Sequence, residues 1–226
     1  MNKVTLLFVA TASILMAPAA EAQFGGLKDA VGSVKGSEET AAPAGVSQET
    51  IVQNFVAANE LVHESNAVLL EALGDKERAA AVREEAASFS TASTEGDKDA
   101  LEGSMVLGEE TSDFIASKIA EGAEISAEGR AKYADGLVLA IEGLMATKGL
   151  AGDAQAFSAS AQDQIKSASI MQKAKVTKKL EAGMFVAKEL PGFTSRLTEN
   201  FSNLMAFAKS ADIPTPDDAT QLLSAL

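Results

Sequence analysis

The chain has 226 residues, of which 46% are hydrophobic and 23% are charged, and its formal net charge is −13. It contains no cysteine, which excludes disulfides, cysteine nucleophiles, thiolate metal sites and lipoprotein anchoring through an N-terminal cysteine. The net negative charge repels the phosphates of nucleic acids, so we expect no nucleic-acid partner.

The first 22 residues have the three parts of a secretory signal peptide. Lys3 supplies a positive charge, residues 4–17 are apolar, and Ala20-Glu21-Ala22 is an A-x-A cleavage site. An uncleaved membrane anchor is disfavoured because the apolar stretch is shorter than the roughly 20 residues that cross a bilayer. We therefore expect cleavage after Ala22, a soluble periplasmic or secreted product, and no transmembrane segment in that product.

Residues 23–46 are rich in Gly, Ser, Ala, Pro and Glu and predict a flexible leader. From residue 47 onward, helical periodicity dominates. Ser47 is a good N-cap for a first helix that ends at Gly74-Asp75. Two further helices are predicted over residues 76–92 and 99–120.

The second half of the chain predicts three more helices. One begins after Ser126 and weakens at "KGLAGD", and the next covers residues 154–190 and stops at Pro191-Gly192. The last covers 193–208, and Thr215-Pro216 is suited to start a final helical turn. Short loops favour antiparallel neighbours. The sequence thus predicts an all-α fold, an antiparallel bundle of about six helices in a single domain over residues 47–226.

Glycines recur at intervals of seven residues, from Gly122 through Gly129 and Gly136 to Gly143. Glycine is unfavourable in a helix, by about 1 kcal/mol relative to alanine, so the pattern calls for an explanation. Close packing against another helix is one reading and simple tolerance of glycine is another. A third is a ligand groove beside the apolar face. Its candidate residues are Gly129, Tyr133, Gly136, Ala140, Gly143 and Thr147.

Charge is distributed unevenly along the chain. Residues 38–128 carry 20 acidic and 5 basic side chains, whereas residues 148–211 carry 9 basic and 5 acidic ones. The basic part predicts a contact region for lipid head groups or an acidic partner. Alternatively, the two halves pair with each other or simply face solvent. The candidate contact residues are Lys173, Lys175, Lys178 and Lys179.

A Glu-x-x-His motif at Glu60 and His63 has the spacing used in di-iron helical bundles. Such a centre needs the motif on two helices, and His63 is the only histidine. Both residues fall opposite the apolar stripe, so we expect them to face solvent. A weakly held divalent ion at Glu60, His63 and Glu64 is the alternative, and no metal site is predicted.

No nucleophile or nucleotide motif supports catalysis: G-x-S-x-G, G-x-x-x-x-G-K-[ST] and G-x-G-x-x-G are all absent. We predict no catalytic residues, no cofactor and no enzymatic activity. The expected function is that of an exported binding protein of the cell envelope, a carrier or sensor of a hydrophobic ligand or lipid. The alternative is a structural or adaptor protein that docks onto an envelope protein.

Overall fold

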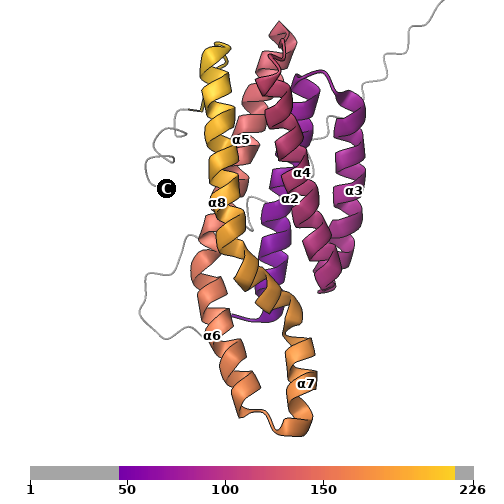
Figure 1. Cartoon of the computed structure of the whole chain (residues 1–226), viewed down its shortest axis with the longest axis vertical. Coiled ribbons are helices and arrows are strands. Elements are labelled where there is room, and N and C mark those ends of the chain that lie inside the picture. Colours follow the sequence, from indigo (N-terminus) through magenta and orange to yellow (C-terminus); the bar gives the residue numbers. More distant parts are fainter. Residues whose placement is uncertain (1–45, 217–226) are drawn as a thin grey trace, which may run out of the picture. The chain divides into compact units, whose positions relative to one another are not determined.

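The computed structural model describes residues 46–216, and all secondary structure in this range is helical (Figure 1). This confirms the predicted all-α class for the described residues. The signal peptide, the leader up to residue 45 and the segment after Pro216 lie outside them; Thr215 and Pro216 themselves are not helical. The helices are α2 (Gln48–Ala72), α3 (Lys76–Thr94), α4 (Lys98–Ala120), α5 (Ala127–Gly149), α6 (Ala151–Ser167), α7 (Ile170–Lys179) and α8 (Glu181–Ser210).

Helices α2 to α5 begin close to where the sequence places them, because capping side chains define their first turns. The hydroxyl oxygen of Ser47 accepts a hydrogen bond from the Thr50 backbone N–H at 3.1 Å, and Ser126 accepts one from Gly129 at 3.0 Å. Gly74, which follows α2, has a φ of 87°, in the left-handed region that glycine adopts without strain.

Helix α2 is the central helix and packs against α3, α4, α5 and α8 (Figure 1). It runs antiparallel to α5, since Val62 faces Gly143 and Ala72 faces Gly129. It runs parallel to α8, because Phe55 contacts Phe193 and the start of α2 lies beside the start of α8. The bundle therefore contains parallel as well as antiparallel neighbours.

The helix predicted over 154–190 is wrong in both extent and continuity. The chain leaves the helical conformation at Ala168 and Ser169, and Leu180 separates α7 from α8. Pro191 does not end a helix but lies inside α8. Leu190 and Phe193, which flank Pro191-Gly192, are 2% and 3% exposed. Burial of two such side chains contributes about 3–6 kcal/mol, which offsets the roughly 3 kcal/mol penalty of proline within a helix.

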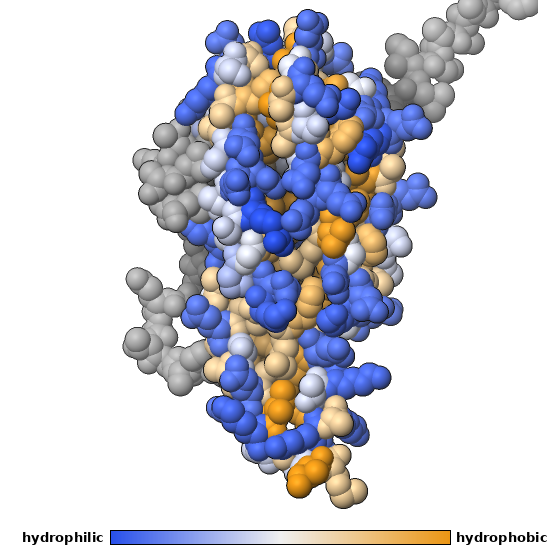
Figure 2. Space-filling model, viewed as in Figure 1, coloured by the Kyte–Doolittle hydropathy of each residue, from blue (hydrophilic) through white to orange (hydrophobic). Residues whose placement is uncertain are grey.

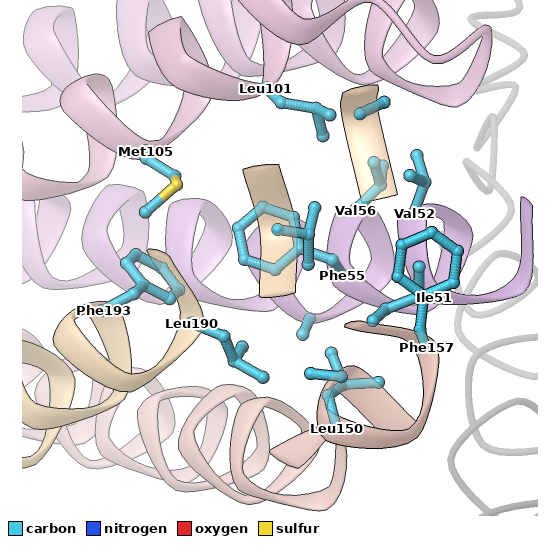
Figure 3. Close-up of a cluster of buried hydrophobic side chains, with 14 of the residues drawn as sticks. Ile51, Val52, Phe55, Val56, Leu101, Met105, Leu150, Phe157, Leu190 and Phe193 are labelled. Carbon is cyan, nitrogen blue, oxygen red and sulfur yellow. The ribbon is translucent and has the colours of Figure 1, made fainter. Parts of the chain in front are cut away.

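The apolar core consists of two clusters along α2. The first, shown in Figure 3, surrounds Phe55, whose ring meets the ring of Phe193 edge-on with centroids 5.6 Å apart. The second surrounds Leu69 and includes Tyr133, Phe201 and Met205. Both clusters combine α2 with α8, which explains why the last long helix is held in the bundle along its length.

Candidate functional site

The glycine face of α5 lies directly against α2. A Cβ atom at Gly129 would be 2.5 Å from the Ala72 carbonyl oxygen, and one at Gly136 would be 2.8 Å from the Cδ2 and Cγ atoms of Leu69. At Gly143 it would be 3.1 Å from Val62. The glycines thus allow the close approach of two helix backbones, as the packing alternative expects.

The other predicted groove residues lie along the same helix. Tyr133 is fully buried, donates its hydroxyl hydrogen to the Leu204 carbonyl oxygen at 3.2 Å, and stacks at a tilt on Phe207. Burial raises the pKa of the Tyr133 hydroxyl. Ala140 is half-buried, and Thr147 is buried with its hydroxyl bonded to the Gly143 carbonyl oxygen. Among the described residues, α2 thus occupies the glycine face of α5 on which the ligand groove is predicted.

An open groove lies elsewhere, between α4 and α8. It has a volume of about 530 Å³, within the range of roughly 300–1,000 Å³ typical of small-molecule sites. The walls are apolar, with Ile115 and Ile119 from α4 facing Leu204 and Phe207 from α8. The full lining is Asn66, Ser112, Ile115, Ala116, Ile119, Ala120, Asn200, Asn203, Leu204, Ala206, Phe207 and Ser210.

The polar groups of this groove are uncharged. Asn66, on α2, is 4% exposed, and its amide donates to the Gly108 carbonyl oxygen and to the Ser112 hydroxyl, each at 3.2 Å. None of the twelve lining residues is charged, although 23% of the chain is. A second groove, of about 640 Å³ between α6 and α8, differs in carrying Lys148 and Glu199 on its wall.

The sequence shows the two helix faces that line the groove but not the space between them. Ile115 and Ile119 are spaced by four residues, and so are Asn200 and Leu204, so each set lies on one helix face. Such spacing is typical of a core-facing stripe. Nothing in the sequence shows that the two faces stay apart at this end of the bundle.

His63 is buried, contrary to the prediction that it faces solvent. Its side chain is 3% exposed, and its Nε2 lies 2.9 Å from the hydroxyl oxygen of Ser104, which also accepts a hydrogen bond from the Asn59 amide at 2.6 Å. His63 Nδ1 and Asn59 Oδ1 have no hydrogen-bond partner among the described residues. Burial lowers the pKa of His63 to about 4, because the positive form would lose its hydration.

The two carboxylates of the predicted ion site are held by other partners. Glu60 accepts a hydrogen bond from the Ser90 hydroxyl, and Glu64 forms an ion pair with Arg83 at 2.8 Å. Arg83 also pairs with Glu71, which in turn pairs with Lys132. The hydrogen bonds from Lys132 and Arg83 hold the pKa of Glu71 below its usual range, and the bond from Lys132 has the larger effect. Within residues 46–216, no three His, Asp or Glu side chains come together as a metal site.

The four predicted contact lysines all lie on α7, and no residue of that helix is buried. The first turn of α7 exposes two apolar side chains, Ile170 at 90% and Met171 at 94%. Figure 2 shows this apolar patch at the lower tip of the molecule beside hydrophilic side chains. The structure thus brings the lysines together on one projecting helix.

The described helices of residues 46–216 include none that is both long and apolar enough to cross a membrane. No protein-family model matches the chain, and no curated protein or solved structure matches it either.

Proposed function

We propose that this chain is an exported binding protein that takes up an uncharged hydrophobic ligand in the groove between α4 and α8. The observation that carries the proposal is the lining: apolar walls, a buried amide at Asn66, and no charged side chain among its twelve residues. Such a lining favours a ligand with an apolar body and at most a few neutral polar groups, since burying a charge there would be costly.

The proposal is one of binding without catalysis. The groove offers amide and hydroxyl groups from Asn and Ser, and no ionisable side chain that could transfer a proton. Its large apolar side chains with surface left exposed are Ile119, Leu204 and Phe207. An acyl chain or a fused-ring lipid of modest size suits this surface.

Ligand uptake is tested by titrating the protein with the uncharged fluorescent probe N-phenyl-1-naphthylamine. We expect saturable binding that Ala116→Phe weakens at least about tenfold, because the ring would occupy the space that the alanine leaves in the groove wall. Ala206→Phe fills the groove from α8 and should act likewise. The matched control is Ala80→Phe on the exposed face of α3, which should leave binding unchanged.

Two results would contradict a ligand site in the groove. One is the absence of saturable probe binding to the native protein. The other is equal affinity in the native protein and in both groove variants, each shown to be folded by circular dichroism.

Export itself is a proposal that rests on the first 22 residues. We expect the intact mass of the protein from its own cells to correspond to a chain that begins at Gln23. A mass that includes residues 1–22 would contradict cleavage after Ala22.

The adaptor alternative rests on the lysines of α7 rather than on the groove. Loss of probe binding in the Ala116→Phe variant would therefore not bear on the adaptor alternative. The two functions are separable, because α7 does not contribute to the groove lining.

A further inference from the structure

The end of the bundle formed by α6 and α7 projects beyond the other helices (Figure 1). Helix α7 has no buried residue, and Val176 is its contact with the first core cluster. An end that packs so little against the bundle contributes little to its stability. Packing of the core therefore places little constraint on which residues occur at this end.

The chain turns from α6 into α7 at the tip, and there it exposes the most accessible large apolar side chains of residues 46–216. Ile170 is 90% and Met171 is 94% exposed, whereas the next most exposed, Met145, is at 50%. Two neighbouring apolar side chains in nearly full contact with water indicate a contact surface rather than a folding element.

Lysines lie on both sides of these two side chains in the sequence. Residues 164–180 contain Lys166, Lys173, Lys175, Lys178 and Lys179 and no acidic residue. The only ion pair of this segment among the described residues is a loose one, between Lys166 and Asp163 at 4.0 Å. Lysine stems are long enough to keep the ammonium groups at head-group level while the tip enters an apolar layer.

The acidic remainder of the protein does not cancel this attraction. Ten residues of α7 extend about 15 Å, at roughly 1.5 Å per residue. That length exceeds the Debye length of about 10 Å at 0.1 M salt, so salt weakens the repulsion between a surface at the tip and the acidic side chains beyond α7. Lys178 and Lys179 lie at the far end of α7 and are weakened in the same way, so the attraction comes mainly from Lys166, Lys173 and Lys175.

We propose that the α6–α7 tip docks onto an anionic lipid bilayer. Ile170 and Met171 enter the boundary between head groups and acyl chains, and Lys173 and Lys175, in the first two turns of α7, lie against the lipid phosphates. A convex tip with apolar side chains at its apex and cations around it complements a charged layer above an apolar one. This inference is independent of the ligand groove, which lies on α4 and α8.

The test is sedimentation of the full chain with vesicles of phosphatidylcholine containing roughly one-third phosphatidylglycerol, compared with vesicles of phosphatidylcholine alone. We expect binding to the anionic vesicles that weakens as salt rises. Changing Lys173, Lys175, Lys178 and Lys179 to Gln should lower the partition coefficient at least about tenfold. The control makes the same change in net charge at Lys76, Lys118, Lys188 and Lys209, which are exposed elsewhere, and should have a much smaller effect.

A second pair of variants tests the apolar apex. Ile170→Ser with Met171→Ser should lower the partition coefficient about tenfold, whereas Val138→Ser with Met145→Ser on α5 should not. Because no residue of α7 is buried, the tip variants should keep the native circular dichroism spectrum.

Three results would overturn the proposal. The native protein could fail to bind anionic vesicles, or bind both kinds of vesicle equally. The lysine variant and its control could lose binding to the same extent. The third result combines two findings: the tip is crosslinked to an acidic protein in intact cells, and neither tip variant changes vesicle binding. That result would assign this surface to a protein partner. Binding of the fluorescent probe in the groove does not depend on the tip. The proposed ligand site and the proposed membrane contact can therefore fail independently.

Discussion

Replacing Gly129 with alanine is expected to lower the free energy of unfolding by about 1–3 kcal/mol. The new Cβ would lie 2.5 Å from the Ala72 carbonyl oxygen, a backbone atom that moves only if the end of α2 moves. The helix-propensity gain of up to about 1 kcal/mol is too small to offset such a clash. Chemical denaturation monitored by circular dichroism gives the difference directly.

The other glycines provide graded comparisons. Gly143→Ala should destabilise less, because the nearest atom is 3.1 Å away at the end of the Val62 side chain. Gly152→Ala is the matched control: it lies in α6 with open space around it, and should stabilise the protein by about 0.5–1 kcal/mol. Equal stabilisation at all three positions would show that the heptad spacing reflects tolerance of glycine rather than close packing.

A double-mutant cycle locates the clash at Gly136. Its added Cβ would lie 2.8 Å from Leu69, which is fully buried. Leu69→Ala alone should destabilise by about 2–5 kcal/mol by leaving a cavity. The double variant should be less destabilised than the sum of the two single variants, because the new methyl group occupies part of that cavity. Strict additivity would show that the two residues do not contact each other.

The second large effect is a loss of stability in mild acid. The pKa of His63 is about 4 in the folded protein, compared with about 6.5 for an unperturbed histidine. The unfolded chain therefore binds a proton in a range where the folded chain does not. The contribution of neutral His63 to the free energy of unfolding is fully present above pH 6.5. It is lost as the pH falls towards 4, where the loss reaches about 3 kcal/mol.

The difference between native protein and a His63→Gln variant isolates this contribution. Carboxylates also titrate in acid: the pKa of Glu71 is lowered, so its stabilising ion pairs are lost as the pH falls further. That loss is common to both proteins and cancels in the difference. The gap in unfolding free energy between the two proteins should shrink or reverse from pH 7 to pH 4. A gap that does not change with pH would show that His63 is not buried in its neutral form.

The same residue shows where sequence reasoning reaches its limit. The capping residues Ser47 and Ser126 and the turn at Gly74 are local signals, and they place the ends of α2 and the start of α5 correctly. The apolar stripe of α2, however, describes one buried face, whereas the helix is surrounded by four others. Polar residues such as Asn59 and His63 are buried because of the helices that pack around α2, and no pattern within the helix shows this.

The prediction for the region from α6 to α8 is wrong for a related reason. Proline and glycine at residues 191–192 are strong local signals for a helix end, but packing of Leu190 and Phe193 in the core outweighs them. The true interruptions, at Ser169 and Leu180, contain neither proline nor glycine. The ligand groove depends on the distance between α4 and α8, which is a property of the assembled bundle, whereas the lysine cluster of α7 is visible in the sequence because it is local.

The polar side chains of α2 have a consequence for the axial register of the bundle. Asn59 bonds to Ser104 and Asn66 bonds to the Gly108 carbonyl oxygen, both on α4, while Ser65 bonds to the Gly136 carbonyl oxygen on α5. Sliding α4 by one helical turn, about 5.4 Å, would break its bonds to Asn59 and Asn66 together and leave buried polar groups unpaired, at about 1–3 kcal/mol each. Apolar packing alone would tolerate such a slip, since one leucine or alanine replaces another. The polar side chains of α2 therefore set the axial positions of α4 and α5 relative to it.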